Sequence, residues 1–294
     1  MAAYRELLLR HFPAAEFAAS EAPGHEYRLA DQAMEAGHTL LVAVGGDGTW
    51  SHVADRIVAS GREDVALGVL PSGTGNDFAR NLEVSYRNPA DAVARLVRGV
   101  AVSVDVGRVN TPSSPAEAST RSSDSERVRH FINVVGVGFD VAVVDAAASA
   151  RFLRGELLYK VTALQQLFRF RGLELSVSDG EGFVRMAPHL MLTVTNGAFF
   201  GGGFPIAPKA RIDDGVLHGC MIGDGTPMRR LALFNKAEKG RHVEEPEVEV
   251  RTARRFTLTA QAPFRFEADG DLYETAVPVL DLEVLPGALQ VIRG

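Results

Sequence analysis

Two glycine-rich turns, each set between an apolar run and a predicted helix, constrain the fold of this 294-residue chain most. The first turn, Gly45–Thr49 (GGDGT), follows the apolar run Thr39–Val44. The second, Pro71–Arg80 (PSGTGNDFAR), follows the apolar run Ala66–Leu70. A short apolar run that ends in glycines is typical of a strand buried on both faces. Because parallel strands end at the same edge of a sheet, we expect the two turns to lie side by side there.

The first part of the chain alternates predicted helices and strands. Besides the two strands above, we expect a strand at 101–106 and helices at 4–12, 24–36, 50–60 and 89–99. Strands separated by helices of this length indicate a parallel sheet with right-handed crossovers. We therefore predict an α/β nucleotide-binding domain over residues 1–108.

The pattern changes in the remainder of the chain. Residues 111–129 are rich in Ser, Pro, Ala and charge, which predicts a flexible loop near the domain boundary. One amphipathic helix is expected at 151–171. Short β-rich runs are expected at 130–136, 173–177, 189–195, 216–222, 248–250, 255–259, 264–268 and 279–285. They predict an antiparallel β-sandwich domain over 109–294, whose last strand returns to the first domain.

Charge and cysteine content exclude several classes of protein. A formal net charge of −6 argues against a nucleic-acid partner. The single cysteine, Cys220, excludes an internal disulfide and fits a reducing cytoplasm. No run of about 18 uncharged apolar residues is present, so no transmembrane segment is expected. A lipid ligand would then be met at a membrane surface.

Both glycine turns have the composition of a phosphate-binding site. Glycines let backbone N–H groups approach a phosphate, and the following helix N-terminus favours negative charge. Asp47 would repel a phosphate, so we expect it to act through a metal ion or to orient a ligand. A tight turn with Asp47 as helix cap is the alternative. Neither turn matches GxxxxGK[ST], which excludes a Walker-type nucleotide site.

Together the two motifs resemble the diacylglycerol kinase catalytic domain family, which includes bacterial lipid kinases and the sphingosine and ceramide kinases. The resemblance covers nearly the whole chain, through 131–140, 195–203, 208–217, 266–271 and 284–289. It implies an α/β domain of the phosphofructokinase and NAD kinase type, a C-terminal β-sandwich, and an active cleft between them. It also implies ATP and Mg²⁺ as cofactors.

The resemblance also assigns site residues. It places nucleotide contacts at Ser20, Gly45, Gly46, Asp47, Gly48, Thr49, Trp50, Ser51, Gly73, Thr74, Asn76 and Asp77. It implies a structural magnesium site at Asp214 and the backbone oxygens of Arg211 and Val216, a donor set that suits a hard cation. The residues alone favour a plain Asp-Asp-Gly hairpin turn there.

Asp269 and Asp271 flank Gly270 between two predicted strands. A carboxylate on such a turn can accept the proton of a lipid hydroxyl while Mg²⁺ and turn amides hold the γ-phosphate. The family usually has Asp-Gly-Glu here and uses it as the general base. The shorter Asp271 leaves that role open between the two aspartates, and a plain hairpin turn is the alternative.

The sequence departs from the family pattern in two further ways. It begins after the strand and Asn-Pro-x-x-Gly loop with which family members start, so we expect the natural start to lie upstream. Ser51 and His52 replace the commoner Asn and Glu. We expect these replacements to weaken contacts with the nucleotide or the metal.

We therefore expect an ATP-dependent lipid kinase that converts diacylglycerol or a related lipid into a phosphatidic-acid-like product. An NAD kinase-like enzyme, which shares GGDGT, and a weak or inactive lipid- or nucleotide-binding homologue are the alternatives. Basic stretches at 151–171 and 229–242 are candidates for docking at the inner face of the membrane, with solvated helix faces as the equal alternative. No motif indicates which lipid is phosphorylated or sets the oligomeric state, and a homodimer stays open.

Overall fold

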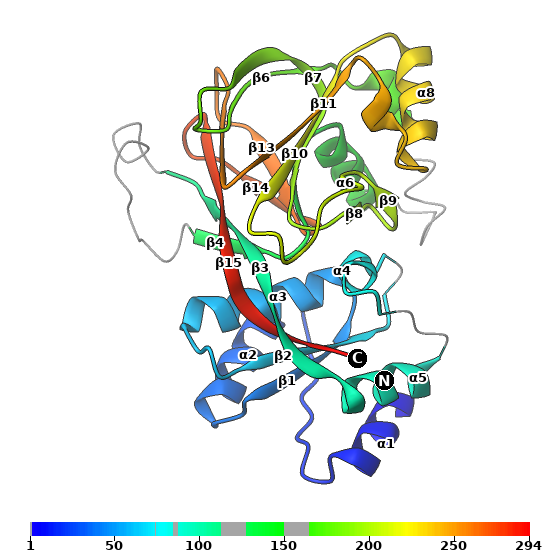
Figure 1. The fold of residues 1–294 in the computed structure, drawn as a ribbon, viewed down its shortest axis with the longest axis vertical. Helices are drawn as coiled ribbons and strands as arrows, with labels where there is room; N and C mark the ends of the chain where they lie inside the picture. Colours follow the sequence, from blue (N-terminus) through cyan, green and yellow to red (C-terminus); the bar gives the residue numbers. More distant parts are fainter. Residues whose placement is uncertain (1, 74, 85–87, 113–127, 150–164) are drawn as a thin grey trace.

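The computed structural model describes residues 2–73, 75–84, 88–112, 128–149 and 165–294. The molecule has two parts, a lower α/β part and an upper β-rich part, which two long strands connect (Figure 1). This arrangement confirms the predicted architecture of an α/β domain followed by a β-sandwich-like domain.

The lower part is built on the two parallel strands that carry the glycine turns. Its elements are α1 (Ala2–His11), α2 (His25–Glu35), β1 (Leu40–Gly45), α3 (Asp47–Ser60), β2 (Ala66–Pro71), α4 (Asp77–Asn81), α5 (Pro89–Arg98) and β3 (Val100–Asn110). β1 and β2 pair in parallel, with Gly45 opposite Pro71 at their ends. Both strands therefore deliver their turns to one edge of the sheet, as predicted.

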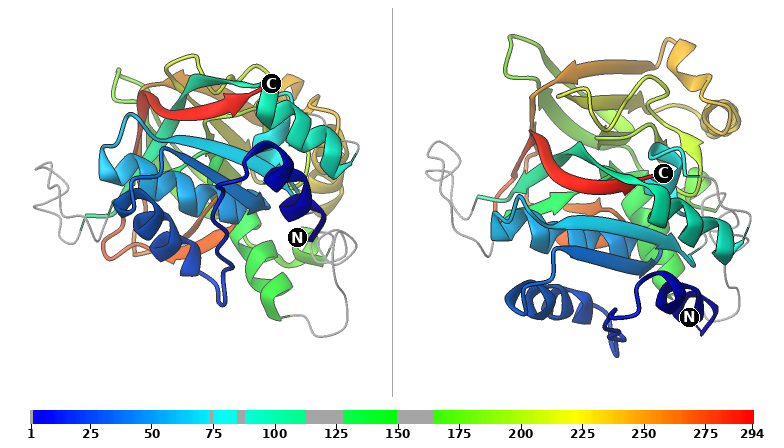
Figure 2. Two further views of the ribbon diagram at one scale, coloured as in Figure 1. Left: turned by 90° about the horizontal axis from the view of Figure 1, so that it is seen from below. Right: turned by 60° about the horizontal axis from the view of Figure 1, so that its bottom comes forward.

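The sheet of the lower part is mixed, which corrects the prediction of a purely parallel sheet. The C-terminal strand β15 (Val279–Arg293) runs parallel to β2, with Val291 opposite Leu67. β3 pairs antiparallel with β15 along most of its length. β15 thus occupies the place beside β2 that a parallel arrangement would give to β3, and it links the two parts (Figures 1 and 2).

The upper part consists mainly of antiparallel strands. Its elements are β4 (Val128–Phe131), β5 (Val134–Gly138), α6 (Phe139–Ser149), β6 (Leu173–Ser178), β7 (Val184–Thr195), β8 (Phe199–Phe200), β9 (Phe204–Pro205), β10 (Leu217–Gly223), α8 (Pro227–Ala237), η2 (His242–Glu244), β11 (Val248–Ala253), β12 (Arg255–Thr259), β13 (Arg265–Ala268) and β14 (Asp271–Glu274). The sheet runs in the order β12, β6, β7, β5, β13, β14, with β10 and β11 beside β7.

Several local predictions in the upper part differ from the structure. The strand expected at 130–136 is two strands, β4 and β5, separated by a bend at Ile132 and Asn133. The helices α6 and α8 were not predicted. The loop expected at 111–129 and the helix expected at 151–171 lie largely outside the described residues; residues 165–169 are helical.

Helix α3 is fixed to the lower sheet through Trp50, which is fully buried. The indole Nε1 donates a hydrogen bond of 3.1 Å to the backbone oxygen of Ala43 on β1. A buried indole N–H normally needs such a partner, and a large aromatic side chain contributes much packing area. Trp50 therefore determines how α3 lies against the strands that carry the glycine turns, and its predicted role in nucleotide contact stays a prediction.

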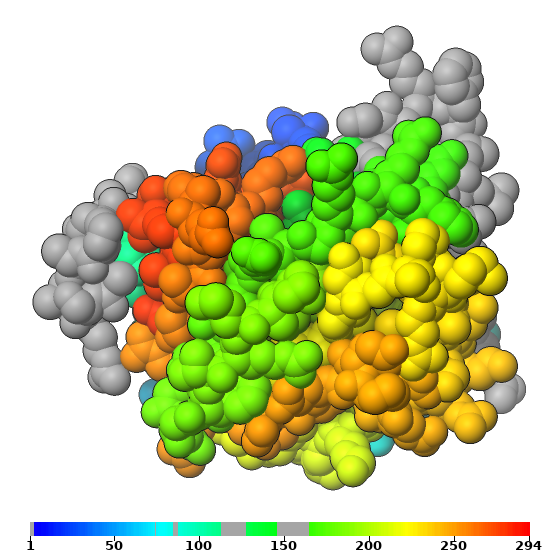
Figure 3. Space-filling view, turned by 90° about the horizontal axis from the view of Figure 1, so that it is seen from above, coloured from blue at the N-terminus to red at the C-terminus, as the bar shows by residue number. Residues whose placement is uncertain are grey.

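The basic residues of α8 are paired within the upper part. Arg229 bonds Glu247 at 2.6 Å, and Lys236 pairs with Glu245. Arg230 bonds Asp224 at 2.7 Å. These carboxylates offset the positive charge of α8, which contributes to the face of the molecule seen in Figure 3, and this favours a structural role for these cations. Within the described residues, no helix has the length and apolar character needed to cross a bilayer.

Candidate active site

The two glycine turns are in direct contact. A methyl group on Gly73 would lie 2.8 Å from the Cα atom of Gly46. The amides of Ser72 and Gly73 donate hydrogen bonds of 2.7 and 3.2 Å to the backbone oxygen of Gly45. The close approach requires residues without side chains at both positions.

We predict that Gly73→Ala lowers stability by about 1–3 kcal/mol, because the added methyl overpacks this contact. The affinity for ATP should fall as well, since the turns must move apart. Chemical denaturation and calorimetric titration with ATP measure the two effects. Gly48→Ala in the first glycine turn is the matched control for stability, because a methyl group there meets no atom within 4 Å.

Asp47 ties the two turns together. Its Oδ1 atom accepts a hydrogen bond of 2.9 Å from the amide of Phe78, in the first turn of α4. The Asn133 side chain of the upper part donates a second bond of 3.3 Å to the same atom. Asp47 thus caps the neighbouring helix α4 and not its own helix α3. The N-cap of α3 is Gly46, which provides no side-chain cap.

Asn76 and Asp77 place unpaired oxygen atoms beside these turns. Asn76 has a left-handed φ of 56° and donates a hydrogen bond of 2.8 Å to the Gly73 oxygen. Asp77 accepts a bond of 2.8 Å from Gly202 of the upper part. Among the described residues, Asn76 Oδ1 and Asp77 Oδ1 are buried without a hydrogen-bond partner, although Arg80 lies 4.0 Å from Asp77 Oδ1. Burial raises the pKa of Asp77 to about 6, and a cation or hydroxyl donor would satisfy both oxygens.

Two asparagines that the sequence analysis did not assign join the parts of the molecule. The Asn81 side chain on α4 donates a hydrogen bond of 3.2 Å to Asn133. It also accepts a bond of 2.9 Å from the amide of Ala198. Asn81 directly follows the second glycine motif, and Asn133 lies in the segment 131–140. Their position within these motifs was the only signal for them in the sequence.

Asp269 is a buried anchor between the two parts. Its Oδ2 atom accepts hydrogen bonds from the Ser51 hydroxyl at 2.6 Å and the Ile132 amide at 2.7 Å. Its Oδ1 atom accepts bonds from the amides of Asn133 at 3.0 Å and Val134 at 2.9 Å. Burial raises the pKa of Asp269 to about 6, while these four bonds act in the opposite direction. A carboxylate so enclosed is better suited to holding the turn than to taking a proton from a ligand.

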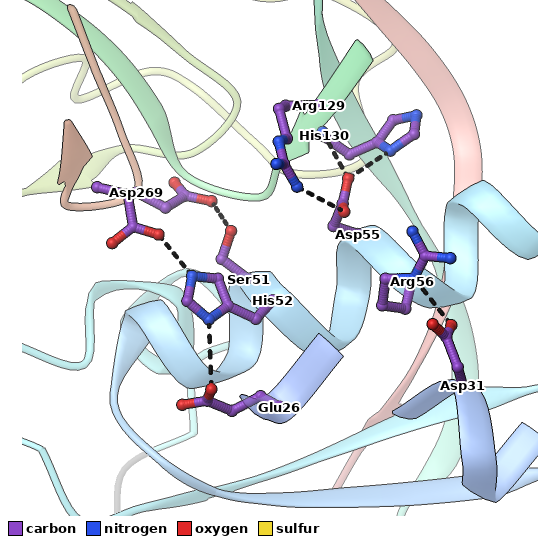
Figure 4. Close-up of polar contacts among 10 residues, drawn as sticks. Glu26, Asp31, Ser51, His52, Asp55, Arg56, Arg129, His130 and Asp269 are labelled. Atoms are coloured by element: carbon purple, nitrogen blue, oxygen red, sulfur yellow. Dashed lines mark hydrogen bonds and ion pairs between the residues drawn. The ribbon is translucent and has the colours of Figure 1, made fainter. Parts of the chain in front are cut away.

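Asp271 differs from Asp269 in its surroundings. Its side chain is 47% exposed, and its Oδ2 atom lies 2.5 Å from His52 Nε2 on α3. Its Oδ1 atom has no hydrogen bond within the described residues. We call the turn Asp269–Asp271 the acidic turn. Ser51 and His52, which were expected to weaken ligand contacts, are the α3 residues that contact it (Figure 4). Of the two aspartates, Asp271 is the one with an oxygen free to meet a ligand.

Helix α3 brings the glycine turns and the acidic turn together. It begins at Asp47, within the first glycine motif, and its residues Ser51 and His52 contact Asp269 and Asp271. At a rise of about 1.5 Å per residue, His52 lies roughly 7.5 Å along the helix axis from Asp47. The acidic turn therefore contacts α3 less than two helical turns from the start of the helix.

Of the predicted nucleotide contacts, Ser20 lies apart from this arrangement. The Ser20 hydroxyl is exposed and donates a hydrogen bond of 3.2 Å to the Ala22 oxygen. No contact between Ser20 and the glycine turns is found among the described residues. Thr74 lies outside the described residues.

The predicted magnesium residues share one turn, but they meet through amides. The Asp214 carboxylate accepts hydrogen bonds of 3.2 Å from the amides of both Arg211 and Val216. His218 Nε2 lies 2.9 Å from Asp214 Oδ2. Within the described residues, no group of three or more His, Cys, Asp or Glu is arranged to hold a metal ion. These contacts fit a capped hairpin turn, and magnesium binding at Asp214 stays a prediction.

A buried pair of carboxyl groups, Asp140 and Glu267, lies behind the acidic turn. Glu267 Oε2 accepts a hydrogen bond of 2.8 Å from the amide of Gly270. The two carboxyls approach each other over Gly136, where a methyl group would lie 1.6 Å from Asp140 and 2.9 Å from Glu267. Burial raises the pKa of Asp140 to about 7, and burial and the nearby Asp140 raise that of Glu267 well above its ordinary value.

We predict that Asp140→Asn stabilises the protein increasingly as the pH rises from about 4 to about 7. In this interval Asp140 keeps its proton in the folded state but has released it in the unfolded chain. The free energy of unfolding of the wild type therefore falls as the pH rises. Asparagine does not titrate, and the difference should grow by up to about 1.4 kcal/mol per pH unit. Urea denaturation at pH 5, 6 and 7 measures it. A difference that is independent of pH would contradict the assignment.

Comparison with known proteins places this geometry in a family. Residues 2–109 match the model of the diacylglycerol kinase catalytic domain. Residues 133–293 match the YegS C-terminal NAD kinase beta sandwich-like domain. These matches define a kinase with an α/β catalytic domain followed by a β-sandwich-like domain.

Individual relatives agree with the family models. A diacylglycerol kinase from Mycobacterium tuberculosis H37Rv is 32% identical over 92% of this chain and 82% of that protein. One from Bacillus subtilis 168 is 25% identical over 86% of this chain and 78% of that protein. The crystal structure of a diacylglycerol kinase from Bacillus anthracis has the same fold, with a TM-score of 0.68 and 18% identity over 98% of this chain and 88% of that chain. The chain belongs to the family of diacylglycerol kinases and YegS-like lipid kinases.

Proposed function

We propose that this protein transfers the γ-phosphoryl group of ATP to the hydroxyl of diacylglycerol or a related lipid, with Asp271 as general base. The hydroxyl O–H bond breaks and its proton passes to Asp271 Oδ1. The hydroxyl oxygen bonds to the γ-phosphorus, and the bond from that phosphorus to the β–γ bridging oxygen breaks. The products are ADP and a phosphatidic-acid-like lipid.

The observation that carries this proposal is the contact between the acidic turn and α3. The same helix begins in the first glycine turn and meets Asp271 through His52 less than two helical turns later. Phosphoryl transfer depends mostly on positioning and charge neutralisation, which a rigid helix between these two features provides. The exposed oxygen of Asp271 is the group suited to receive the proton.

The residues around the glycine turns fit a triphosphate and a divalent cation. The N-cap residue of α3, Gly46, provides no side-chain cap, so the backbone N–H groups at the start of α3 have no capping side chain. Such groups favour phosphate oxygens. Asp77 Oδ1, which accepts no hydrogen bond from the described residues, and the Asp47 carboxylate are the candidates to hold Mg²⁺. When bound, Mg²⁺ would neutralise charge that develops on the phosphates.

The two alternative functions have less support. The relatives are named as diacylglycerol kinases and YegS-like lipid kinases, which favours a lipid acceptor over NAD. The exposed Asp271 oxygen and the contact between the glycine turns favour an active enzyme over an inactive homologue. We further propose that the protein works in the cytoplasm and meets its lipid at the inner face of the membrane.

An ATP-turnover assay with a panel of acceptors tests the proposal. The panel contains diacylglycerol, monoacylglycerol, ceramide and sphingosine in mixed micelles, together with NAD⁺. We expect ³²P transfer from ATP to a lipid hydroxyl. Transfer to NAD⁺ alone would support the NAD kinase alternative. Absence of transfer to every acceptor, with ATP binding retained, would support the inactive homologue.

A further inference from the structure

His52 occupies a position between two carboxylates from different parts of the molecule. Its Nε2 atom lies 2.5 Å from Asp271 Oδ2 in the upper part. Its Nδ1 atom lies 3.8 Å from Glu26 Oε2 on α2 in the lower part. The His52 side chain is 12% exposed and that of Glu26 is 15% exposed. Both ring nitrogens therefore face carboxylate oxygen in a largely buried setting (Figure 4).

The imidazole ring is held in a defined orientation. Tyr27 stacks on it, with 4.3 Å between ring centroids and 25° between ring planes. The charge of Arg129, which lies over the Tyr27 ring, is offset by Asp55 at 3.9 Å. The titratable and charged groups around His52 come from α2, β4, the acidic turn and β14: Glu26, Tyr27, Arg129, Asp269, Asp271 and Tyr273.

A hydrogen-bonded proton between nitrogen and an ionised carboxylate must sit on the nitrogen, since the carboxylate only accepts. His52 Nδ1 and Glu26 Oε2, 3.8 Å apart, are both buried without a hydrogen-bond partner in the part of the chain that the structure describes. The form that suits the site is the imidazolium, which donates to Asp271 and places its second N–H and its positive charge beside Glu26. Burial disfavours this charge. The hydrogen bond to Asp271 and the charges of Asp271, Glu26 and Asp269 outweigh burial and raise the pKa of His52.

We propose that His52 is a positioning residue for the general base, held as an imidazolium by Glu26 so that it orients the carboxylate of Asp271. The inference rests on the proposed function for its catalytic meaning. His52 Nε2–H holds Asp271 Oδ2, which leaves Oδ1 directed to receive the hydroxyl proton. The side chain of Asp271 is short, and His52 fixes where it can reach. Loss of the His52 proton weakens this hold, so activity falls on the alkaline side.

Two variants test the arrangement. His52→Gln keeps a neutral N–H donor for Asp271 but removes the titration and the charge. We expect kcat to fall about 10- to 100-fold with KM for ATP within about twofold, and the alkaline decline of kcat to disappear. Glu26→Gln should keep most of the activity at pH 6.5 and move the alkaline decline to lower pH.

A readout independent of catalysis is the imidazole titration of His52, followed by ¹⁵N NMR. We expect its midpoint above the ordinary value of about 6.5 in the wild type and lower in both Glu26→Gln and Asp271→Asn. The matched control is Glu16→Gln, because Glu16 faces the exposed His38 at 3.7 Å in a similar pair. This control should leave the His52 midpoint and the kcat profile unchanged.

The outcomes separate this inference from the proposed function. If the wild type transfers phosphate to a lipid but His52→Gln changes neither kcat nor its pH profile, the positioning role is wrong and the kinase proposal stands. If the His52 midpoint does not respond to Glu26→Gln, the proposed interaction between His52 and Glu26 is wrong, whatever the activity. If no acceptor is phosphorylated while the midpoint responds as expected, the proposed function and the positioning role of His52 are both wrong. Only the interaction of His52 with Glu26 and Asp271 is then confirmed.

Discussion

Asp271→Asn is expected to lower kcat for lipid phosphorylation by about 10²- to 10⁴-fold, the range for loss of a general base. The amide has nearly the same shape and can still accept a hydrogen bond, but it cannot take up a proton at neutral pH. KM for ATP should change little, because Asp271 belongs to the acidic turn and not to the glycine turns. Steady-state kinetics with diacylglycerol at saturating ATP measures this effect.

The control for Asp271→Asn is Glu274→Gln, which removes one negative charge from the exposed end of the same strand, β14. This control should retain kcat within about twofold, since surface substitutions away from special features have small effects. Equal activity of Asp271→Asn and the wild type, in a lipid-dependent assay, would rule out the base assignment. It would leave Asp271 as a structural partner of His52.

The sequence predicted the lower part well because its signals are local. The apolar runs before the glycine turns place β1 and β2, and the strand pairing follows from parallel geometry. A return of the last strand to the first domain was expected, but its pairing with β2 and the mixed sheet that results were not. The partner of β2 is β15, more than 200 residues later in the chain, and only the tertiary structure brings Val291 beside Leu67.

The candidate site shows the same limit. The turn Asp269–Asp271 was found from its composition, but composition does not distinguish two aspartates separated by one residue. The two aspartates differ because a bend separates β4 from β5. The amides of Ile132, Asn133 and Val134 at this bend all donate to Asp269. The partners of His52 and the buried carboxyl pair likewise depend on contacts distant in sequence.

Asp269→Ala is expected to lower the free energy of unfolding by about 3–5 kcal/mol and to abolish activity. It leaves three backbone amides and the Ser51 hydroxyl without their shared acceptor in a buried setting, and each unpaired donor carries a desolvation cost. Such a loss is large beside a total stability of about 5–15 kcal/mol for a typical domain. Urea denaturation measures the free energy, and circular dichroism shows whether the fold survives.

Three comparisons identify the cause of this loss. Asp269→Gly removes the same bonds but suits the left-handed φ of 47°, so it should be about 1 kcal/mol less destabilising than alanine. Asp179→Ala removes an aspartate that accepts hydrogen bonds from the amides of Glu181 and Phe183 at a partly exposed turn, and should cost about 1 kcal/mol or less. Ser51→Ala combined with Asp269→Ala should cost less than the sum of the single changes, because both remove the same bond. Strict additivity would contradict the direct contact, and an unchanged stability of Asp269→Ala would contradict the anchor itself.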